Sequence, residues 1–327
     1  MDFCCRLPKI ELHAHLNGSV SHKTLKELLD DRQLDEFNRF EQDCAIGELQ
    51  DFFKLFGFVY SVSNTPANIA FITKAVIKDF QRDGCVYMEI RSTPRCSQSM
   101  TRRDYVQSLM DGTAEASTDG IIVKWILSID RRHSLQEALE IVSLAIEYKN
   151  QGVVAVDLCG DPFAGSFTSL RPAFDKARAA GLKVTLHLAE VKAMQSETLE
   201  MLRYLPDRIG HGTFLDSDAR SMVIGKSIPI EVCLTSNLHC KTVSKIEDHH
   251  FIDFHFEGHP CVICTDDKGI FQSSLSNEYA LASSAFSLSP LDCVNLSRRS
   301  VNFIFADENV KTHLIKLMDD FCRIEGL

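Results

Sequence analysis

The stretch KIELHAHL, residues 9–16, has the length and alternation of a short β-strand and carries two histidines near its end. Successive side chains of a strand point to opposite faces, so His13 and His15 are expected side by side on one face. A His-x-His pair is a weak signal by itself, because such a pair can equally be structural. Its meaning depends on what the rest of the chain places at the same end of the sheet.

Seven further short apolar, β-branched runs follow, and longer amphipathic stretches separate them. They are VYMEIR (86–91), IIVKWILSI (121–129), VVAVDLC (153–159), KVTLHLA (183–189), RIGHG (208–212), IPIEVCL (228–234) and CVICTDD (261–267). Strands that alternate with helices imply parallel βαβ units. Eight strands fit a closed (β/α)8 barrel better than an open sheet. We therefore predict an α/β fold, a single TIM-barrel domain over residues 1–327.

Two segments between these runs show clear helical patterns, SLQEALEIVSLAIEYKNQG (134–152) and RPAFDKARAAGL (171–182). In the second, Pro172 is predicted near the helix start and Gly181 near its end. The apolar face predicted for the first comprises Leu135, Leu139, Val142 and Ile146.

The first connection, at about 17–85, is far longer than usual and contains several helical patterns. It predicts a helical insertion that partly covers the site. Residues 268–327 are expected to supply the last helices of the barrel.

Composition limits the possible partners and location. The formal net charge of −10 argues against binding to nucleic acid polymers or to anionic membranes, because both need a basic face. No apolar run approaches the ~18 residues of a membrane span, and the N-terminus lacks the pattern of a signal peptide. The twelve cysteines are scattered, mostly within apolar runs, as in a reduced intracellular protein. We expect a cytoplasmic monomer that binds a small molecule.

Polar and reactive residues stand at the carboxyl ends of nearly all the predicted strands. They are His13, His15, Arg91, Ser92, Thr93, Asp130, Asp157, Gly160, Asp161, His187, Glu190, His211, Thr235, Ser236, Asn237, Asp266 and Asp267. Barrel enzymes build their active sites at this face, whereas a purely structural core does not need charged groups there. The pattern therefore predicts an enzyme.

Three histidines and one carboxylate at these strand ends suggest a metal site. His187 ends the fifth strand and Asp266 ends the eighth, and they join His13 and His15. This ligand set suits one Zn²⁺ ion per chain, with a position left for water.

A different zinc site is suggested by HFEGHPCVICTDD, residues 255–267, because H-x-E and P-C-x-x-C are motifs of cytosine-type zinc deaminases. Only two residues separate Glu257 from Pro260, whereas those enzymes carry the motifs on separate helices. Cys261 and Cys264 also lie three apart in a predicted strand, so their side chains should face opposite ways. We expect both to pack in the core. The remaining histidines of this region are expected in loops at the barrel rim, without a role; they are His249, His250, His255 and His259.

Several strand-end residues have two interpretations. Glu190 could lean over the metal as an acid or face solvent at a helix start. His211, flanked by glycines, could face substrate or be a core histidine. Asp267 could orient His211 or bind substrate. The segment Ser92-Thr93-Pro94-Arg95 offers two hydroxyls and a guanidinium, a compact phosphate site, although a plain turn with a solvated arginine remains possible.

With these residues placed, the chain resembles the adenosine/AMP deaminase family of metal-dependent barrel hydrolases. The matching motifs occur in the family's order and span nearly the whole chain. They are KIELHAHLNGS at the start, GDP (160–162), HLAE (187–190), IGHGT (209–213), LTSN (234–237) and TDD (265–267). The adenosine deaminase-like subgroup is the most similar, because of RSTPR (91–95), DRR (130–132) and CTDDKG (264–269).

The resemblance implies a zinc-dependent deaminase acting at purine C6. It implies that Glu190 donates a proton to purine N1, that His211 assists the attacking water, and that Asp267 contacts this water or the purine. The metal ligands it implies are His13, His15, His187 and Asp266. The substrate-binding residues it implies are His15, Asn17, Tyr60, Ser92, Thr93, Pro94, Arg95, Asp130, Asp157, Gly160 and Asp267.

Within that set, Ser92, Thr93 and Arg95 would surround a 5′-phosphate, Asp130 and Asp157 would lie nearer ribose and base, and Gly160 would offer its backbone amide to purine N3. Tyr60 stands where the subgroup usually carries a histidine, so its role is open. The expected reaction is N6-methyl-AMP plus water to IMP plus methylamine. Adenosine or AMP deamination, and a catalytically silent ligand-binding relative, are the alternatives.

Overall fold

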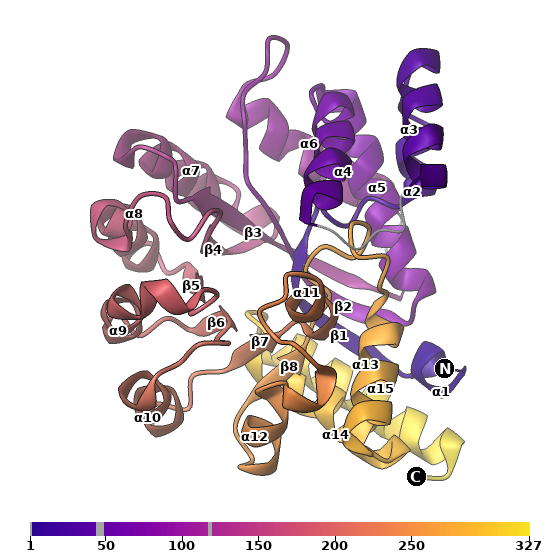
Figure 1. Ribbon diagram of the computed structural model, residues 1–327, viewed down its shortest axis with the longest axis vertical. Coiled ribbons are helices and arrows are strands. Elements are labelled where there is room, and N and C mark those ends of the chain that lie inside the picture. The colour runs from indigo at the N-terminus through magenta and orange to yellow at the C-terminus, as the bar shows by residue number, and fades with distance from the viewer. Residues whose placement is uncertain (1, 44–48, 117–119) are drawn as a thin grey trace.

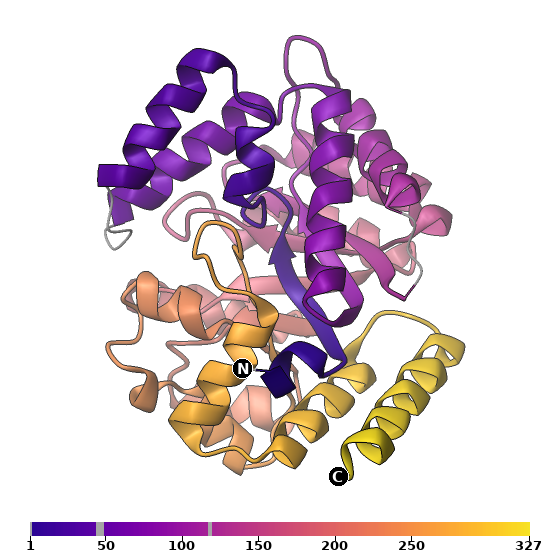
Figure 2. The same cartoon turned by 90° about the vertical axis from the view of Figure 1, so that its right-hand side faces the viewer.

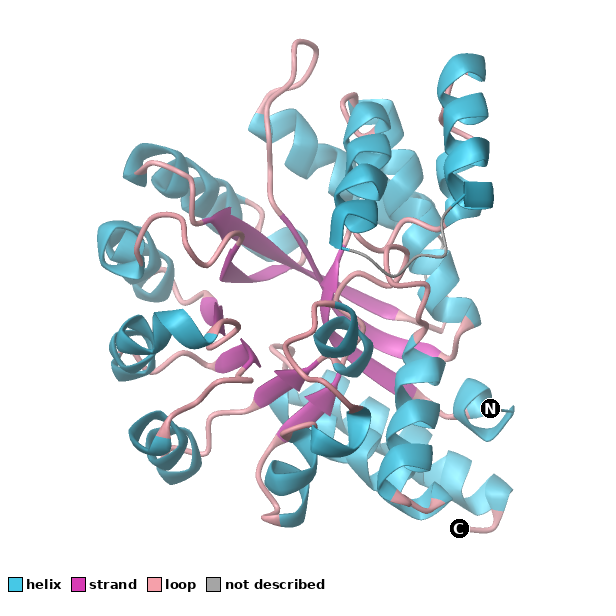
Figure 3. Cartoon of the chain, in the orientation of Figure 1, coloured by secondary structure: helices cyan, strands magenta, loops and turns pink. Residues whose placement is uncertain are grey.

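The computed structural model describes residues 2–43, 49–116 and 120–327 of the chain. Eight parallel strands form one sheet in the order β1 to β8 and curve into a barrel, with helices outside it (Figures 1 and 3). The strands are β1 Lys9–His15, β2 Cys85–Ser92, β3 Ile122–Asp130, β4 Val153–Cys159, β5 Lys183–Leu188, β6 Arg208–His211, β7 Ile230–Val232 and β8 Cys261–Ile263. The (β/α)8 prediction is confirmed.

The barrel closes at a single bridge just past the end of β8. Ala14 of β1 pairs with Asp266, which lies three residues beyond that strand. The amide of Asp266 donates to the carbonyl of His13 at 2.7 Å, and the amide of His15 donates to the carbonyl of Asp266 at 2.9 Å. The seam of the barrel thus brings Asp266 next to the two histidines of the opening motif.

All eight predicted strands occur, but the last two are shorter than predicted. The run 228–234 contains only the three residues of β7, because α11 begins at Leu234. The run 261–267 contains only the three residues of β8, because the backbone bends beyond it and Asp266 adopts a φ of 61°. These early ends free the following residues to turn into the barrel mouth.

Helices surround the barrel, and a helical insertion covers one end of it. The helices are α1 Asp2–Arg6, α2 His22–Lys26, α3 Asp31–Asp43, α4 Leu49–Val62, α5 Pro66–Arg82, α6 Arg102–Glu115, α7 Leu135–Glu147, α8 Phe167–Ala179, α9 Gln195–Arg203, α10 Ser217–Gly225, α11 Leu234–His239, α12 Phe251–Phe256, α13 Leu275–Phe286, α14 Pro290–Ser300 and α15 Glu308–Glu325. Short 3₁₀ turns cover Lys149–Gln151, Lys192–Met194, Ile246–Asp248 and Val301–Phe303. Figure 2 shows the insertion helices at one end of the barrel and α15 towards the other.

The apolar face of α7 was predicted correctly in part. Val142 is buried, and Leu139 and Ile146 are partly buried against the core, as predicted. Leu135 is 37% exposed, because it lies in the first turn behind a capping box of Ser134 and Glu137. The buried face is centred on Ala138, Ile141, Val142, Leu144 and Ala145. The two small alanines allow close approach to the barrel, and this packing decides the face more strongly than the larger leucines do.

The start of α8 was also predicted too late. The helix begins at Phe167, where the Ser166 side chain accepts a hydrogen bond from the amide of Ser169. Pro172 consequently lies inside the helix and not at its start, whereas Gly181 follows the helix end as predicted, with a φ of 75°. The N-cap interaction of Ser166 and the burial of Phe167 together let the helix begin five residues before the proline.

Two apolar clusters hold the barrel together. The larger lies between the sheet and the surrounding helices, and a second joins Ile10 and Leu12 of β1 to Leu314 and Met318 of α15. None of the helices in the described residues is long and apolar enough to span a membrane.

The packing of α6 on α5 can be tested by comparing two glycines that lie in helices. In Gly112→Ala the new Cβ would lie 2.4 Å from the carbonyl oxygen of Ala70 on α5, so we expect a loss of about 1–3 kcal/mol of stability. Gly57→Ala, on an open side of α4, meets nothing within 4 Å and should gain roughly 0.5–1 kcal/mol. Thermal unfolding of both variants measures this, and equal shifts in Tm would contradict the packing of α5 on α6.

Candidate active site

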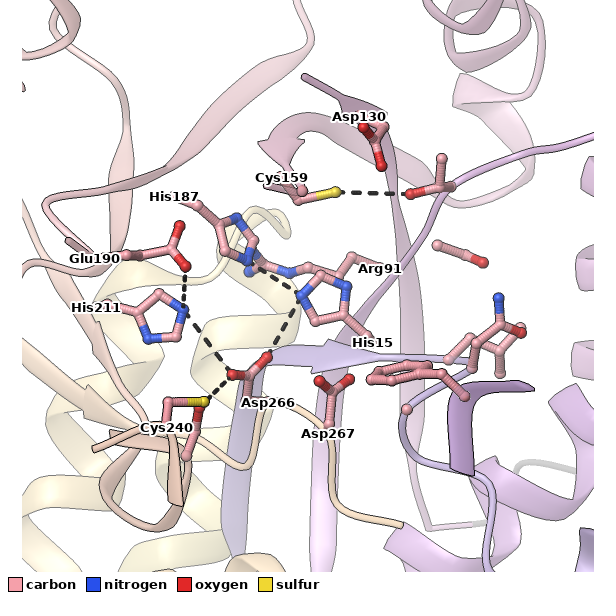
Figure 4. Close-up of a pocket in the computed structure, with 18 of the residues that line it drawn as sticks. His15, Arg91, Asp130, Cys159, His187, Glu190, His211, Cys240, Asp266 and Asp267 are labelled. Atoms are coloured by element: carbon pink, nitrogen blue, oxygen red, sulfur yellow. Dashed lines mark hydrogen bonds and ion pairs between the residues drawn. The ribbon is translucent and has the colours of Figure 1, made fainter. Parts of the chain in front are cut away.

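A cavity of about 620 Å³ opens at the carboxyl ends of the strands, a volume suited to a small-molecule ligand (Figure 4). Most of the predicted site residues line it. These are His15, Asn17, Tyr60, Ser92, Thr93, Arg95, Asp130, Gly160, His187, Glu190, His211, Asp266 and Asp267. The structure therefore brings together side chains from seven strand ends and from α4 of the insertion.

Three of these side chains form a compact donor cluster with His13, which lies behind the cavity wall. His13, His15, His187 and Asp266 each place one ligand atom within 4.8 Å of the others. The two Nε2 atoms of His15 and His187 lie 3.1 Å apart, and Asp266 Oδ1 lies 3.5 Å from the Nε2 atoms of His13 and His15. His13 Nε2 is buried and has no hydrogen-bond partner among the described residues. A buried, unpartnered nitrogen facing a carboxylate and two imidazoles is what a divalent metal would satisfy.

The opposite ring nitrogens show how the imidazoles are oriented. His13 Nδ1 lies 2.7 Å from Glu231, and His187 Nδ1 lies 2.9 Å from Asp157. Each carboxylate accepts a hydrogen bond from the Nδ1–H group, which leaves Nε2 with its lone pair towards the cluster. Asp266 is fixed in turn, because Ser236 donates to its Oδ2 at 2.7 Å. Glu231 was not among the predicted site residues.

A fully buried network of charged side chains contacts the donor cluster. Glu231 accepts hydrogen bonds from Arg91 and Arg208, each at 2.7 Å. Arg208 also contacts Glu89 at 2.7 Å, and Arg91 lies 3.4 Å from Asp157. Burial alone would raise the pKa of Glu231, but the two guanidiniums hold it well below its usual value. Glu231 therefore remains an anion that can orient His13.

Asp157 and Pro94 do not line the cavity, contrary to their predicted place at the substrate. Asp157 is fully buried behind His187 and also accepts a hydrogen bond from Ser128 at 3.0 Å. Its position two residues before the end of β4 places it inside the barrel, and Cys159 occupies the cavity wall instead. Asp157 thus contacts a donor histidine, and its contact with ribose or base stays a prediction.

Glu190 and His211 lie together beside the donor cluster (Figure 4). His211 Nε2 is 3.9 Å from both Glu190 Oε2 and Asp266 Oδ2. Burial raises the pKa of Glu190 and lowers that of His211 well below its usual value. The structure thus places a carboxyl group whose acid form is favoured beside an imidazole whose neutral form is favoured, at the wall of the cavity rather than in solvent or in the core.

Left-handed backbone holds these side chains in place. The backbone φ angle is 55° at Ala189, 62° at His211 and 61° at Asp266. Residues other than glycine rarely adopt such values. Such conformations persist only where the surrounding structure enforces them, and they concentrate at functional sites.

Asp267 lines the cavity next to Asp266 (Figure 4). Burial and the neighbouring carboxylate of Asp266 raise its pKa well above the usual value. The close approach depends on Gly18, because a Cβ there would lie 1.6 Å from Asp267 Oδ1.

At the other side of the cavity, Arg95 is anchored and not a solvated loop residue. Its Nη2 donates to the carbonyl of Ser63 at 2.7 Å, and its guanidinium lies 4.4 Å from the centre of the Tyr60 ring. Thr93 and Tyr60 line the same part of the cavity. The cavity also contains residues without a predicted role, namely Phe56, Arg132, His133, Cys159, Ser236, Asn237, Cys240, Thr242 and Phe271.

The model of the adenosine deaminase family matches residues 8–321. The chain belongs to this family. It is 40% identical to the N6-methyl-AMP deaminase of Homo sapiens, over 96% of this chain and 93% of that protein. A crystal structure of Arabidopsis ADAL complexed with IMP is 36% identical, covers all of both chains and superposes with a TM-score of 0.94.

Family membership makes the chain a hydrolytic deaminase acting on purine C–N bonds. The family and its amidohydrolase neighbours are metal-dependent, in agreement with the donor cluster. An amidohydrolase from Burkhoderia ambifaria, solved with bound zinc, has the same fold at a TM-score of 0.81 and 21% identity.

Cys261 and Cys264 pack apart in this deaminase. Cys261 belongs to the cluster between sheet and helices, and Cys264 to the cluster that includes Ile10 and Leu12. The prediction that the four nearby histidines lie in loops is wrong only for His255, which lies in α12. His249, His250 and His259 lie outside the helices and strands, as predicted, although His249 and His259 are buried. His249 Nε2 lies 3.0 Å from Asn237 Oδ1, and the Nε2 atoms of His250 and His259 donate to the carbonyls of His211 and Ile228, so these three imidazoles satisfy polar groups that burial would otherwise leave unpaired.

The contact between Asp157 and His187 can be tested directly. Asp157→Asn keeps the shape of the side chain but weakens its hold on His187, so we expect metal affinity to fall about 10- to 100-fold. Competition with a chelator measures the affinity, and the exposed Asp175→Asn on α8 is the control. A variant that keeps its metal but loses affinity for nucleoside ligands would support the ribose contact instead.

Proposed function

We propose that the chain hydrolyses N6-methyl-AMP to IMP and methylamine and uses one Zn²⁺ ion. The observation that carries this proposal is the division of one cavity into two ends. The donor cluster lies at one end with Glu190 and His211, and Arg95 lies at the other beside Thr93. A purine nucleotide has matching ends, a ring carbon that reacts and a phosphate that does not. Relatives named N6-methyl-AMP deaminase support the choice of substrate.

Zinc is favoured over other divalent ions by the chemistry of the donors. His13, His15 and His187 supply nitrogen and Asp266 supplies oxygen, a set typical of catalytic zinc. When bound, zinc lowers the pKa of a water molecule and provides a strong nucleophile at neutral pH.

The residues around the metal site donate and accept the protons of the reaction. Burial raises the pKa of Glu190 and so favours its acid form, which donates a proton to purine N1 and makes C6 more electrophilic. His211 is neutral and can accept the proton of the attacking water, which Asp267 helps to position. The C6–O bond forms and the bond from C6 to the exocyclic nitrogen breaks. The water proton taken by His211 passes to this nitrogen, which leaves as methylamine. The proton from Glu190 stays on N1 of IMP, and the second water proton returns to Glu190 as the C6 carbonyl forms.

The rest of the cavity would orient the nucleotide. Gly160, at a φ of 98°, offers its backbone amide to purine N3, and Asn17 lies beside the ligand. Ser92, Thr93 and Arg95 would hold the 5′-phosphate, as a guanidinium pairs well with this group. AMP would meet the same groups at C6. Adenosine would leave the Arg95 guanidinium without an anionic partner, so the cavity favours a nucleotide.

Replacement of Glu190 tests the proton donor. Glu190→Gln should bind zinc and IMP normally but lose about 10²- to 10⁴-fold in kcat, because the amide cannot donate an acidic proton. The wild-type rate should fall as pH rises through the raised pKa of Glu190, since the acid form is then lost, and the variant should lack this step.

The exposed Glu257→Gln, on the outside of the barrel, is the matched control. Near-normal turnover by Glu190→Gln, measured by ultraviolet absorbance with bound zinc verified, would refute the assignment.

A further inference from the structure

Arg132 lies at the wall of the cavity, directly after β3. Its side chain is 71% exposed, yet its guanidinium is fixed in one geometry. Nε donates to Asp130 Oδ1 at 2.8 Å, and Nη2 donates to Asp130 Oδ2 at 2.6 Å. The backbone amide of Arg132 donates to the same Oδ1 at 2.8 Å. This is a bidentate pair that orients the guanidinium as well as neutralising it.

Asp130 is itself built into position. Its amide donates to His133 Nδ1 at 3.2 Å, and its carboxyl group packs under Gly160, where a Cβ would lie 2.8 Å from Asp130 Cγ. Exposed salt bridges contribute little to stability, about 0–1 kcal/mol. Stability alone therefore does not explain why three polar contacts and a glycine fix this pair at the mouth of a cavity.

The pair lies in the same part of the cavity as the proposed phosphate site. Tyr60, which packs against the Arg95 guanidinium, is close enough to Arg132 to interact with it electrostatically, and so is Cys159. Thr93 lies 3.7 Å from the sulfur of Cys159, so the ends of β2, β3 and β4 meet here. Two guanidiniums thus approach one space from neighbouring strands.

Arg132 keeps donors available for a ligand. A guanidinium has five N–H groups, and Asp130 engages two of those on Arg132, the Nε–H and one Nη2–H. The other N–H groups of Arg132 have no side-chain partner among the described residues, and Arg132 lines the cavity.

We propose that Arg132 is a second guanidinium of the 5′-phosphate site, and that Asp130 is the positioning residue that holds it over the cavity. The proposal rests on the nucleotide specificity proposed above and adds what determines it. A phosphate monoester carries up to two negative charges, and the far end of the cavity holds the carboxyl groups of Glu190, Asp266 and Asp267. Two cations at the near end, Arg95 and Arg132, would both neutralise the phosphate and orient the nucleotide with its base towards the acids.

Calorimetric binding of IMP and of inosine to the zinc-loaded protein tests this, because the two ligands differ only in the phosphate. Arg132→Ala should weaken IMP binding about 10- to 100-fold and leave inosine binding unchanged. Arg132→Lys should recover part of the loss, because lysine keeps the positive charge but lacks the paired N–H donors of a guanidinium. Asp130→Asn should weaken IMP binding several-fold, also without affecting inosine.

Arg103→Ala, an exposed arginine paired with Glu147, is the control and should bind both ligands normally. Arg95→Ala shows how large the loss of a phosphate contact is. Equal weakening of IMP and inosine in Arg132→Ala, or no weakening of either, would overturn the role of Arg132 even if wild-type protein prefers IMP. Wild-type protein that binds IMP no better than inosine would overturn the nucleotide proposal, and the role of Arg132 with it.

Discussion

The contact between Glu231 and His13 is the interaction on which the site depends. A carboxylate buried inside a barrel is stable only if it is paired, and Arg91 and Arg208 pair this one. The buried network of Glu89, Asp157, Glu231, Arg91 and Arg208 carries three negative and two positive formal charges, a sum of −1. Asp266 brings the sum to −2, which a divalent cation on the donor cluster would balance. The network and the metal site therefore form one electrostatic unit.

The topology of the barrel explains how this unit reaches the substrate. The sheet closes where His13, Ala14 and His15 meet the backbone of Asp266, so the seam of the barrel is also the centre of the donor cluster. Strain in the left-handed residues His211 and Asp266 is held by the same packed surroundings. The donor cluster is thus built on strand ends, whereas Tyr60, which packs against Arg95, comes from the helical insertion.

Much of the fold could be predicted because strand patterns and strand-end residues are local features. His13, His15, His187 and Asp266 were predictable because ligand-type residues at barrel strand ends converge in space. Side-chain orientation within the barrel was less predictable. Glu231 lies in the apolar run IPIEVCL, which predicts only a strand. A single charged residue inside such a run is the signal that could have identified Glu231 as part of the site. The place of Asp157 could not be predicted, because the sequence does not show which residue of β4 borders the cavity. The buried face of α7 depends on tertiary packing.

The central claim is that one cavity joins a C6-hydrolysing centre to a phosphate site. A parallel ultraviolet assay on N6-methyl-AMP, AMP and adenosine, with bound metal measured in the same preparation, tests it most directly. The account predicts the highest kcat/KM for N6-methyl-AMP, the lowest for adenosine, and a zinc content close to one equivalent per chain. Faster turnover of adenosine than of either nucleotide, or full activity in protein without bound metal, would contradict it.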